Sequence, residues 1–213
     1  KNHFNGDEEN SGLIKQLSKR IGVLKKIRKY MPKKKFMMAV NSIFTSKLIY
    51  CIAVWGGIWG LSNQKNNDRK HMSISKYQMQ KLQILQNKTL RLISGLDYET
   101  PTKVLLESCN QLSVHQLVAY HTACQVFKIK KSKLPSYHHN RLFPGDISKY
   151  RTRQQNIDMA RIAFDLSLAR SSFFYQASQL WPLIPENIRL SKTVENFKTK
   201  CKKWIKNNIS AKV

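Results

Sequence analysis

Positive charge is the strongest constraint that this sequence places on its fold. Thirty-eight lysines and arginines stand against twelve aspartates and glutamates, which gives a formal net charge of +26 in 213 residues. A globular chain with this excess repels itself unless counterions or a polyanion neutralise it. Nucleic acid is the commonest such partner, and an anionic membrane surface is the other. The basic residues occur in every quarter of the chain, which favours a working surface over a terminal targeting signal.

Apolar residues recur with helical spacing, and no segment alternates as a strand would. At about 100° per residue, the apolar side chains of residues 13–30 fall on one face of a helix and the lysines on the other. These lysines are Lys15, Lys19, Lys25, Lys26 and Lys29. Pro32 can open a second helix, whose first turn holds Lys33, Lys34 and Lys35 although the helix dipole disfavours cations there. Hydrophobic residues at 41% suffice for a core, so we expect an all-α fold.

Turn and capping signals divide the rest of the chain. A third helix should end at Gly95, and the capping box of Ser113 and Gln116 should open a long helix that is buried almost all round. Residues 132–153 are expected to form a loop, and further helices should follow near 155–170, 172–179 and 193–206. We predict four segments: a disordered end over 1–10, a helical segment over 11–61, a polar linker over 62–73 and a helical C-terminal domain over 74–213.

Cysteine usage and hydropathy favour a protein that is neither secreted nor membrane-bound. The four cysteines are widely spaced and form no Cys-x-x-Cys pair, unlike those of a secreted disulfide scaffold. The first residues lack the apolar core of a signal peptide. The longest apolar run, residues 48–61, is broken by Gly56 and Gly57 and is too short to span a bilayer. We expect a nuclear or cytoplasmic location and no membrane partner.

One set of residues has the chemistry of a metal site. Zinc binds cysteine and histidine, and the weak candidates are Cys109, His115, His121 and Cys124. His121 and Cys124 lie one helical turn apart, but their apolar neighbours on a buried helix are the ordinary surroundings of a core histidine and a core thiol. The spacings also fail to match known zinc sites. We expect neither a bound metal nor another cofactor.

The sequence lacks the motifs of a catalytic centre. It contains no Gly-x-Ser-x-Gly, no His-Glu-x-x-His, no glycine-rich phosphate loop and no Asp-Asp pair. Two-metal phosphoryl transfer needs clustered carboxylates, and the one acidic cluster, Asp7 to Glu9, lies in the predicted disordered end. The chain alone is therefore not expected to be an enzyme.

Nucleic-acid binding is the function that these features favour. Lysine neutralises phosphates and releases their counterions, whereas a merely solvated face usually mixes both signs of charge. Tyr150 lies beside two arginines, while Trp181, Phe197 and Trp204 are more typical of a core. The residues predicted to contact nucleic acid are Lys15, Lys19, Lys25, Lys26, Lys29, Lys33, Lys34, Lys35, Arg151 and Arg153. Phosphate contacts carry little base information, so RNA, DNA and a hybrid duplex are all open as ligands.

Several stretches, taken in order, resemble one family. The order begins with residues 13–60, which include Leu-Ile-Tyr-Cys-Ile-Ala-Val-Trp-Gly-Gly, and continues with Lys-Leu-Gln-Ile-Leu-Gln-Asn-Lys-Thr-Leu-Arg-Leu-Ile-Ser-Gly at 81–95. Later come Tyr-Arg-Thr-Arg at 150–153, Ser-Phe at 172–173, Trp-Pro-Leu-Ile-Pro at 181–185, Phe197 with Lys198, and Trp204. Together they are similar to the thumb and C-terminal region of Jockey-like non-LTR (LINE-type) retrotransposon reverse transcriptases.

The resemblance implies a helical thumb-like bundle followed by a second helical bundle. It also implies a thumb that grips the template–primer duplex, with contacts from the lysine face of the first helix and from Lys33 to Lys35. Pro182 and Ile184 depart from the family, which usually has asparagine and leucine there. No stretch matches the fingers, the palm with its metal-binding aspartates or the endonuclease, so the resemblance carries over no catalytic residue.

Three functions are compatible with the sequence. The first is a non-catalytic nucleic-acid-binding segment of a retrotransposon-derived reverse transcriptase, which grips template–primer or RNA. The second is a subunit that acts as an RNA-directed DNA polymerase only when it is joined to a palm domain carried elsewhere. The third is a basic structural or interaction protein.

Overall fold

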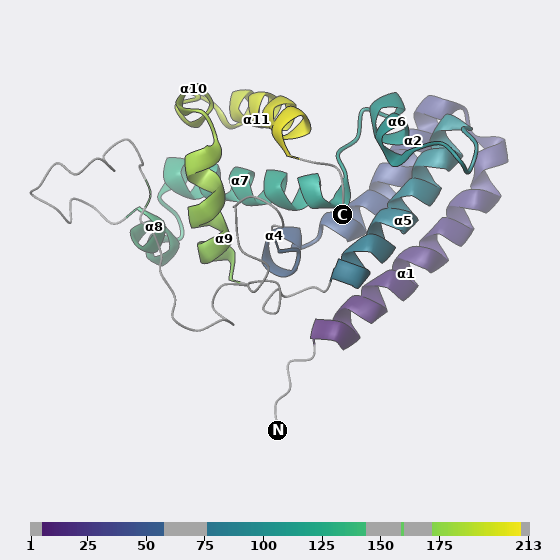
Figure 1. Cartoon of the computed structure of the whole chain (residues 1–213), viewed down its shortest axis with the longest axis horizontal. Coiled ribbons are helices and arrows are strands. Elements are labelled where there is room, and N and C mark those ends of the chain that lie inside the picture. Colours follow the sequence, from purple (N-terminus) through teal and green to yellow (C-terminus); the bar gives the residue numbers. More distant parts are fainter. Residues whose placement is uncertain (1–5, 58–75, 144–158, 160–171, 210–213) are drawn as a thin grey trace, which may run out of the picture. The chain divides into compact units, whose positions relative to one another are not determined.

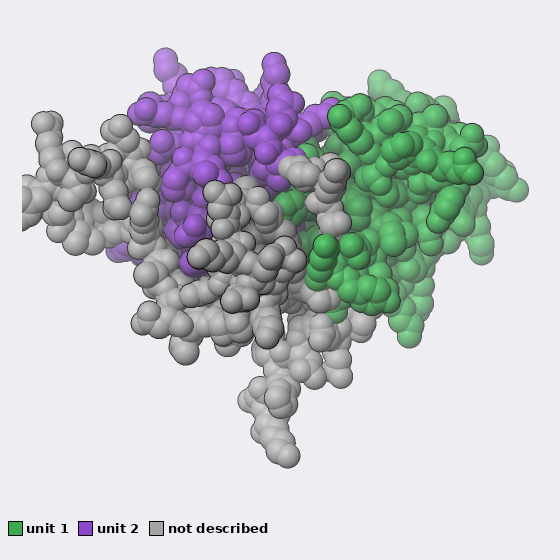
Figure 2. Space-filling view, viewed as in Figure 1, with its two compact units in different colours: residues 1–56, 73–117, 211–213 green, residues 57–72, 118–210 purple. Residues whose placement is uncertain are grey.

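The structure is a computed structural model, and it describes residues 6–57, 76–143, 159 and 172–209. Every element in these residues is a helix (Figure 1), which confirms the predicted all-α fold. None of the described helices combines the length and the apolar character that a membrane span requires. The chain divides into two compact units (Figure 2). Among the described residues, the first unit holds 6–56 and 76–117, and the second holds 57, 118–143, 159 and 172–209.

This division differs from the predicted one. The predicted linker, residues 62–73, lies outside the described residues, and the predicted C-terminal domain grouped everything from residue 74 onward. In the structure residues 76–117 belong with the N-terminal helices, because the helix that begins at Lys76 packs against them. The boundary between the units falls after Leu117 instead.

The first unit begins with α1 (Gly6–Ile27) and the 3-10 turn η1 (Arg28–Tyr30). The helix already starts at Gly6, within the segment over 1–10 that the sequence predicts as a disordered end, and residues 1–5 lie outside the described part. Leu17, Ile21 and Leu24 are buried, while the lysines of the helix are exposed. The two faces that helical periodicity predicts are therefore confirmed.

A longer rod follows, made of α2 (Lys33–Val40), the π-helical segment η2 (Asn41–Thr45) and α3 (Ser46–Ile49). Its buried residues lie four apart and are Phe36, Val40, Phe44 and Leu48. In a regular α-helix, residues four apart are offset by about 40° around the helix axis, so a stripe of such residues winds around the helix. A π turn holds more than four residues, so within it residues four apart are offset in the opposite direction. The π segment thus keeps the stripe on one side of the rod. At Cys51 the backbone turns through a left-handed conformation (φ 52°) into α4 (Ile52–Trp55).

The central helix of the first unit is α5 (Lys76–Ser94), which contacts α1, α2 and α6 (Thr102–Ser108). It lies beside α1 (Figure 1), and the two helices run in the same direction, since Arg28 just beyond α1 donates to the carbonyl of Leu92 near the end of α5. The helix ends before Gly95, as predicted, where a φ of +76° favours glycine.

Buried amides join α5 to the segment before α7. Gln83 Nε2 donates to Gln86 Oε1 and to Asn87 Oδ1, each at 2.9 Å. Gln83 Oε1 accepts from the amide of Val114 at 2.9 Å, and Gln86 Nε2 donates to the carbonyl of Leu112 at 2.8 Å. All three side chains are buried, and hydrogen bonds to protein replace those that they would make to water. The network holds residues 112–114 against α5.

α7 (Val114–Ser132) begins at the predicted capping box. The amide of Ser113 donates to Gln116 Oε1 at 3.0 Å, and the amide of Gln116 donates to Ser113 Oγ at 3.2 Å. Buried residues then occur on nearly every side of the helix, which confirms the prediction of a core helix. The first turn of α7 belongs to the first unit, and the rest belongs to the second.

The second unit continues with α8 (Ser136–Leu142), α9 (Phe173–Leu180), the 3-10 turn η5 (Trp181–Leu183), α10 (Glu186–Arg189) and α11 (Val194–Asn208). Its core is aromatic. The rings of Phe127 and Phe197 stack with centroids 4.2 Å apart, and the ring of Trp181 lies 6.0 Å from that of Phe197. Trp181 and Phe197 are fully buried, as predicted.

Two predictions for the second unit are wrong. Residues 136–142 of the predicted loop form α8, with Pro135 in extended backbone at the N-cap, where its missing N–H breaks no helical hydrogen bond. Helical structure also continues between the predicted helices at 172–179 and 193–206, through η5 and α10, because Pro182 lies in a first turn and needs no amide partner there. The helix predicted over 155–170 lies outside the described residues apart from Met159.

The last helix, α11, is capped by Thr193, whose hydroxyl accepts from the amide of Asn196 at 3.2 Å. Phe197, Cys201 and Ile205 form its buried stripe. Trp204 is predicted to share this stripe, but it is only half-buried, because helical spacing places it about 60° from the middle of the stripe.

Phe197 and Trp204 should therefore differ in their contribution to stability. Phe197→Ala removes a fully buried ring that stacks on Phe127, so we expect the free energy of unfolding to fall by about 3–5 kcal/mol. Trp204→Ala should cost less than half as much, since its ring is partly in solvent. Urea denaturation followed by circular dichroism measures both, and equal losses would show that Trp204 belongs to the core.

Candidate nucleic-acid interface

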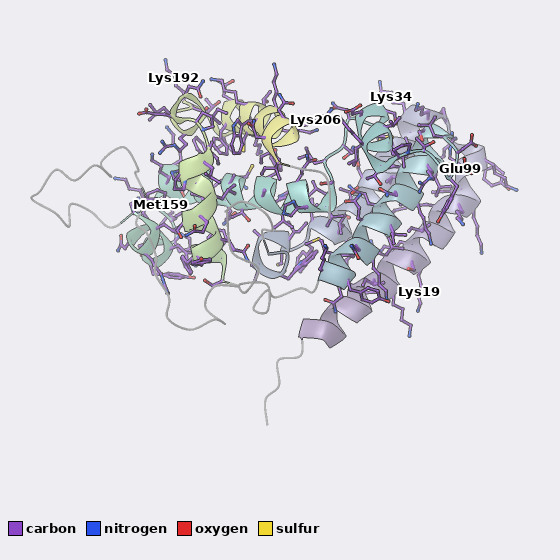
Figure 3. All side chains as sticks on the ribbon, viewed as in Figure 1. Lys19, Lys34, Glu99, Met159, Lys192 and Lys206 are labelled. Carbon is purple, nitrogen blue, oxygen red and sulfur yellow. The ribbon has the colours of Figure 1, made fainter. Side chains whose placement is uncertain are left out.

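The α1 lysine face is the set of exposed lysines of α1: Lys15, Lys19 and Lys26 opposite the buried stripe, and Lys25 on its flank. Figure 3 shows Lys19 extending from α1 away from the ribbon. Leu17 and Leu24, which are fully buried, anchor the helix and so set the direction of these side chains. Lys25 and Lys26 lie in the last turn, where the helix dipole favours cations.

A second group of predicted lysines follows at the start of α2. Lys33, Lys34 and Lys35 are exposed, and their turn has no acidic residue and no side-chain cap. The helix dipole disfavours a cation here by roughly 0.3–1 kcal/mol, so folding gains nothing from their position. Lys29 in η1 is also exposed, and its Nζ lies 4.8 Å from the ring centroid of Tyr30.

Little negative charge neutralises these lysines within the described residues. The carboxylates of the first unit whose side chains are described belong to Asp97, Glu99 and Glu107, and all three are exposed. Between described side chains, the one lysine–carboxylate pair within 4 Å joins Lys198 to Glu195 on α11, at 3.0 Å. No described carboxylate therefore lies within 4 Å of the α1 lysine face or of the lysines of α2.

The arginines of the first unit have a different role, which the sequence did not reveal. Arg28 Nε donates to the carbonyl of Leu92 at 2.7 Å, and Arg20 donates to the carbonyl of Ile43 in the π segment. Arg91 donates to backbone carbonyls of the loop that follows α5. Helical spacing places Arg20 at the border of the apolar stripe of α1, and Arg28 follows the helix on the stripe's side; these positions are the signal that could have distinguished them from Lys15, Lys19 and Lys26. These guanidinium groups hold the unit together.

The remaining basic residues to consider are two predicted arginines and the lysines of α11. Arg151 and Arg153 are outside the described residues. On α11, Lys198, Lys202 and Lys206 are half-buried beside the apolar stripe, whereas Lys200 and Lys203 are exposed. The lysines of α11 therefore form a less open surface than those of α1.

The weak metal candidates do not assemble within the described residues, where no group of three or more His, Cys, Asp or Glu side chains could hold an ion. In the first unit, the buried Cys109 thiol donates to the carbonyl of Leu90 at 3.8 Å, and His115 is buried in the first turn of α7. In the second unit, burial raises the pKa of Cys124 to about 11 and lowers the pKa of His121. Metals bind the thiolate, so a thiol held protonated is a poor ligand.

The structure places Cys124 with Tyr120 and Cys201 instead. Burial, and then the proximity of Cys124, raises the pKa of the Tyr120 hydroxyl and of the Cys201 thiol well above their usual ranges. All three groups are thus neutral near pH 7; Cys124 and Cys201 belong to the core between α7 and α11, and Tyr120 is half-buried beside them. Cys201 was not among the candidates, although its spacing from Phe197 on α11 indicates a buried position.

Comparison of the chain with protein-family models, with curated proteins and with solved structures gives no match. Function must therefore be inferred from the residues and their geometry. The most distinctive surface of the described residues is the exposed lysine array of α1 and α2, whose flexible point charges can attract an extended polyanion.

The cysteines should differ in their reactivity with iodoacetamide. Cys51 is exposed and should react in the folded protein at pH 8, while Cys109, Cys124 and Cys201 are buried and should be protected. Alkylation needs the thiolate, and a pKa of about 11 keeps Cys124 almost entirely protonated at that pH. Mass spectrometry of the alkylated peptides, with and without urea, measures this. Native Cys124 reacting as fast as Cys51 would contradict its burial.

Proposed function

We propose that this chain is a non-catalytic nucleic-acid-binding segment that holds a template–primer duplex or RNA through phosphate contacts. The contacts come from the α1 lysine face, Lys29 and the three lysines that open α2. One observation carries the proposal: these lysines are exposed and have no carboxylate partner among the side chains that the structure describes, while the buried stripe of α1 fixes their direction. Folding does not account for such an array, and a phosphate backbone does.

The dimensions of α1 suit a duplex. From Lys15 to Lys26 the helix rises about 16 Å, and a duplex presents roughly ten phosphates over that length. Lysine carries a compact charge on a flexible stem, so its contacts tolerate variation in phosphate position. Arg20, Arg28 and Arg91 donate to backbone carbonyls and cannot at the same time form bidentate pairs with guanine. Binding should consequently depend weakly on base sequence.

The resemblance to the thumb of Jockey-like non-LTR retrotransposon reverse transcriptases supports a duplex as the ligand. A thumb grips template–primer without taking part in the chemistry, which agrees with the absence of palm motifs from this sequence. In this proposal the chain derives from such a polymerase, whose palm domain would lie elsewhere, and it meets its ligand in the nucleus or the cytoplasm.

Salt should control the affinity if phosphate contacts dominate. The logarithm of the affinity for a blunt duplex should fall linearly with the logarithm of the salt concentration, and six contacts would give a slope of about −5. Fluorescence anisotropy of a labelled duplex over a range of potassium chloride concentrations measures this slope. A nearly flat response would rule out the electrostatic mechanism.

Replacing the α1 lysine face by glutamine should separate binding from folding. The quadruple variant Lys15→Gln, Lys19→Gln, Lys25→Gln and Lys26→Gln should keep its melting temperature, because exposed lysines contribute little to stability. Affinity for RNA, DNA and hybrid duplexes should fall together, and the salt slope should flatten by about 3–4.

The matched control replaces four exposed lysines of the second unit: Lys128, Lys131, Lys200 and Lys203. Both quadruple variants remove the same amount of charge, so a general attraction would weaken equally in the two. If the control loses as much affinity as the α1 variant, the net charge and not the α1 lysine face accounts for binding.

A further inference from the structure

Exposed tyrosines in the first unit are each accompanied by a cation. Four rings are largely in solvent, with exposed fractions of 75%, 70%, 64% and 81% for Tyr30, Tyr50, Tyr77 and Tyr98. A lysine or arginine lies 4.2–5.9 Å from the centroid of each ring, and these residues are Lys29, Lys47, Lys81 and Arg91. Rings this exposed bury little area, so the core does not explain them.

The two most exposed rings belong to segments that hydrogen bonds join. Tyr30 follows Arg28, whose Nε donates to the carbonyl of Leu92 at 2.7 Å. Arg91 immediately precedes Leu92 in α5, and its Nη2 donates to the carbonyl of Tyr98 at 2.7 Å. Tyr30 and Tyr98 thus lie at the same end of the first unit, where both α1 and α5 terminate. Tyr77 lies near the start of α5, and the helix rises about 25 Å from there to its end at Ser94.

The same end carries the lysines that open α2. Arg28 also donates to the carbonyl of Met31, which brings the start of α2 to this position. In Figure 3 Lys34 and Glu99 mark this end of the unit, and Lys19 lies farther back along α1. Asp97 and Glu99 are the carboxylates described here, against Lys29 and the three α2 lysines. The charge around the two rings is therefore positive on balance.

We infer that this end of the first unit binds unpaired nucleotides next to a duplex, an inference that rests on the proposed function. The rings of Tyr30 and Tyr98 stack on exposed bases, and the α2 lysines hold the phosphates between them. Single-strand binding sites combine these two elements, a cationic track and aromatic stacking platforms. Bases inside a duplex already stack on one another, so these rings select a single-stranded overhang. The surrounding positive charge favours nucleic acid over a protein partner for the rings.

Two DNA probes test the inference: a blunt duplex, and the same duplex with a single-stranded thymidine overhang. The protein should bind the overhang probe about 25-fold more tightly, from about fivefold for each of two stacked bases. Tyr30→Ala with Tyr98→Ala should abolish this preference and leave affinity for the blunt duplex within about twofold. The double variant Tyr30→Phe with Tyr98→Phe keeps both rings and should keep the preference.

The matched control is Tyr77→Ala, which removes an equally cation-paired ring at the other end of α5 and should keep the preference. Melting curves check that every variant folds. As a measurement that needs no variant, photocrosslinking of a 5-iodouracil overhang to the unaltered protein should label the peptides that contain Tyr30 and Tyr98.

The outcomes distinguish this inference from the proposed function. Salt-dependent binding of the blunt duplex without any preference for the overhang overturns the inference and leaves the proposed function standing. Failure to bind either probe overturns both. An alanine double variant that keeps the preference, a Tyr77→Ala variant that loses it, or crosslinks confined to other peptides would also overturn the inference. The two rings would then be better assigned to a protein interface.

Discussion

The buried side chains of α5 are the constraint on which the first unit depends. Its apolar residues are packed within the unit, while Gln83, Gln86 and Asn87 hydrogen-bond to one another and to the backbone that leads into α7. A buried amide that loses one partner keeps its full desolvation cost, so this network tolerates only one alignment of α5 against residues 112–114. That alignment also determines where α7 begins.

The position of α1 on α5 separates the roles of the two basic residue types. Arginine has a planar fork of donors and is less strongly hydrated than lysine, so it can reach backbone carbonyls from the apolar side of a helix. Arg20 on α1 and Arg28 just beyond it do this, and each bonds to a segment distant in sequence. The lysines occupy exposed positions, where their charge costs no desolvation. The exposed charge is thus set by the same packing that holds the helix.

The parts of the fold that the sequence predicts correctly are those decided within one helical turn. Ser113 and Gln116 form their capping box because both partners lie three residues apart, and Gly95 ends α5 through its own backbone conformation. The bond from the amide of Val114 to Gln83 spans 31 residues, and no local pattern indicates it. The π segment escapes prediction for the same reason, because it depends on what packs against the helix.

The same distinction applies to the candidate interface. Helical spacing correctly predicts that Lys15, Lys19 and Lys26 are exposed together, because exposure on one helix follows from the position of its apolar stripe. It cannot predict that the segments of Tyr30 and Tyr98 lie at one end of the unit, since that depends on the bond between Arg28 and Leu92. A surface assembled from two helix ends is therefore a property of the parallel pairing of α1 and α5. Any change that shifts this pairing should alter the aromatic end of the surface more than the α1 lysine face, whose residues share one helix.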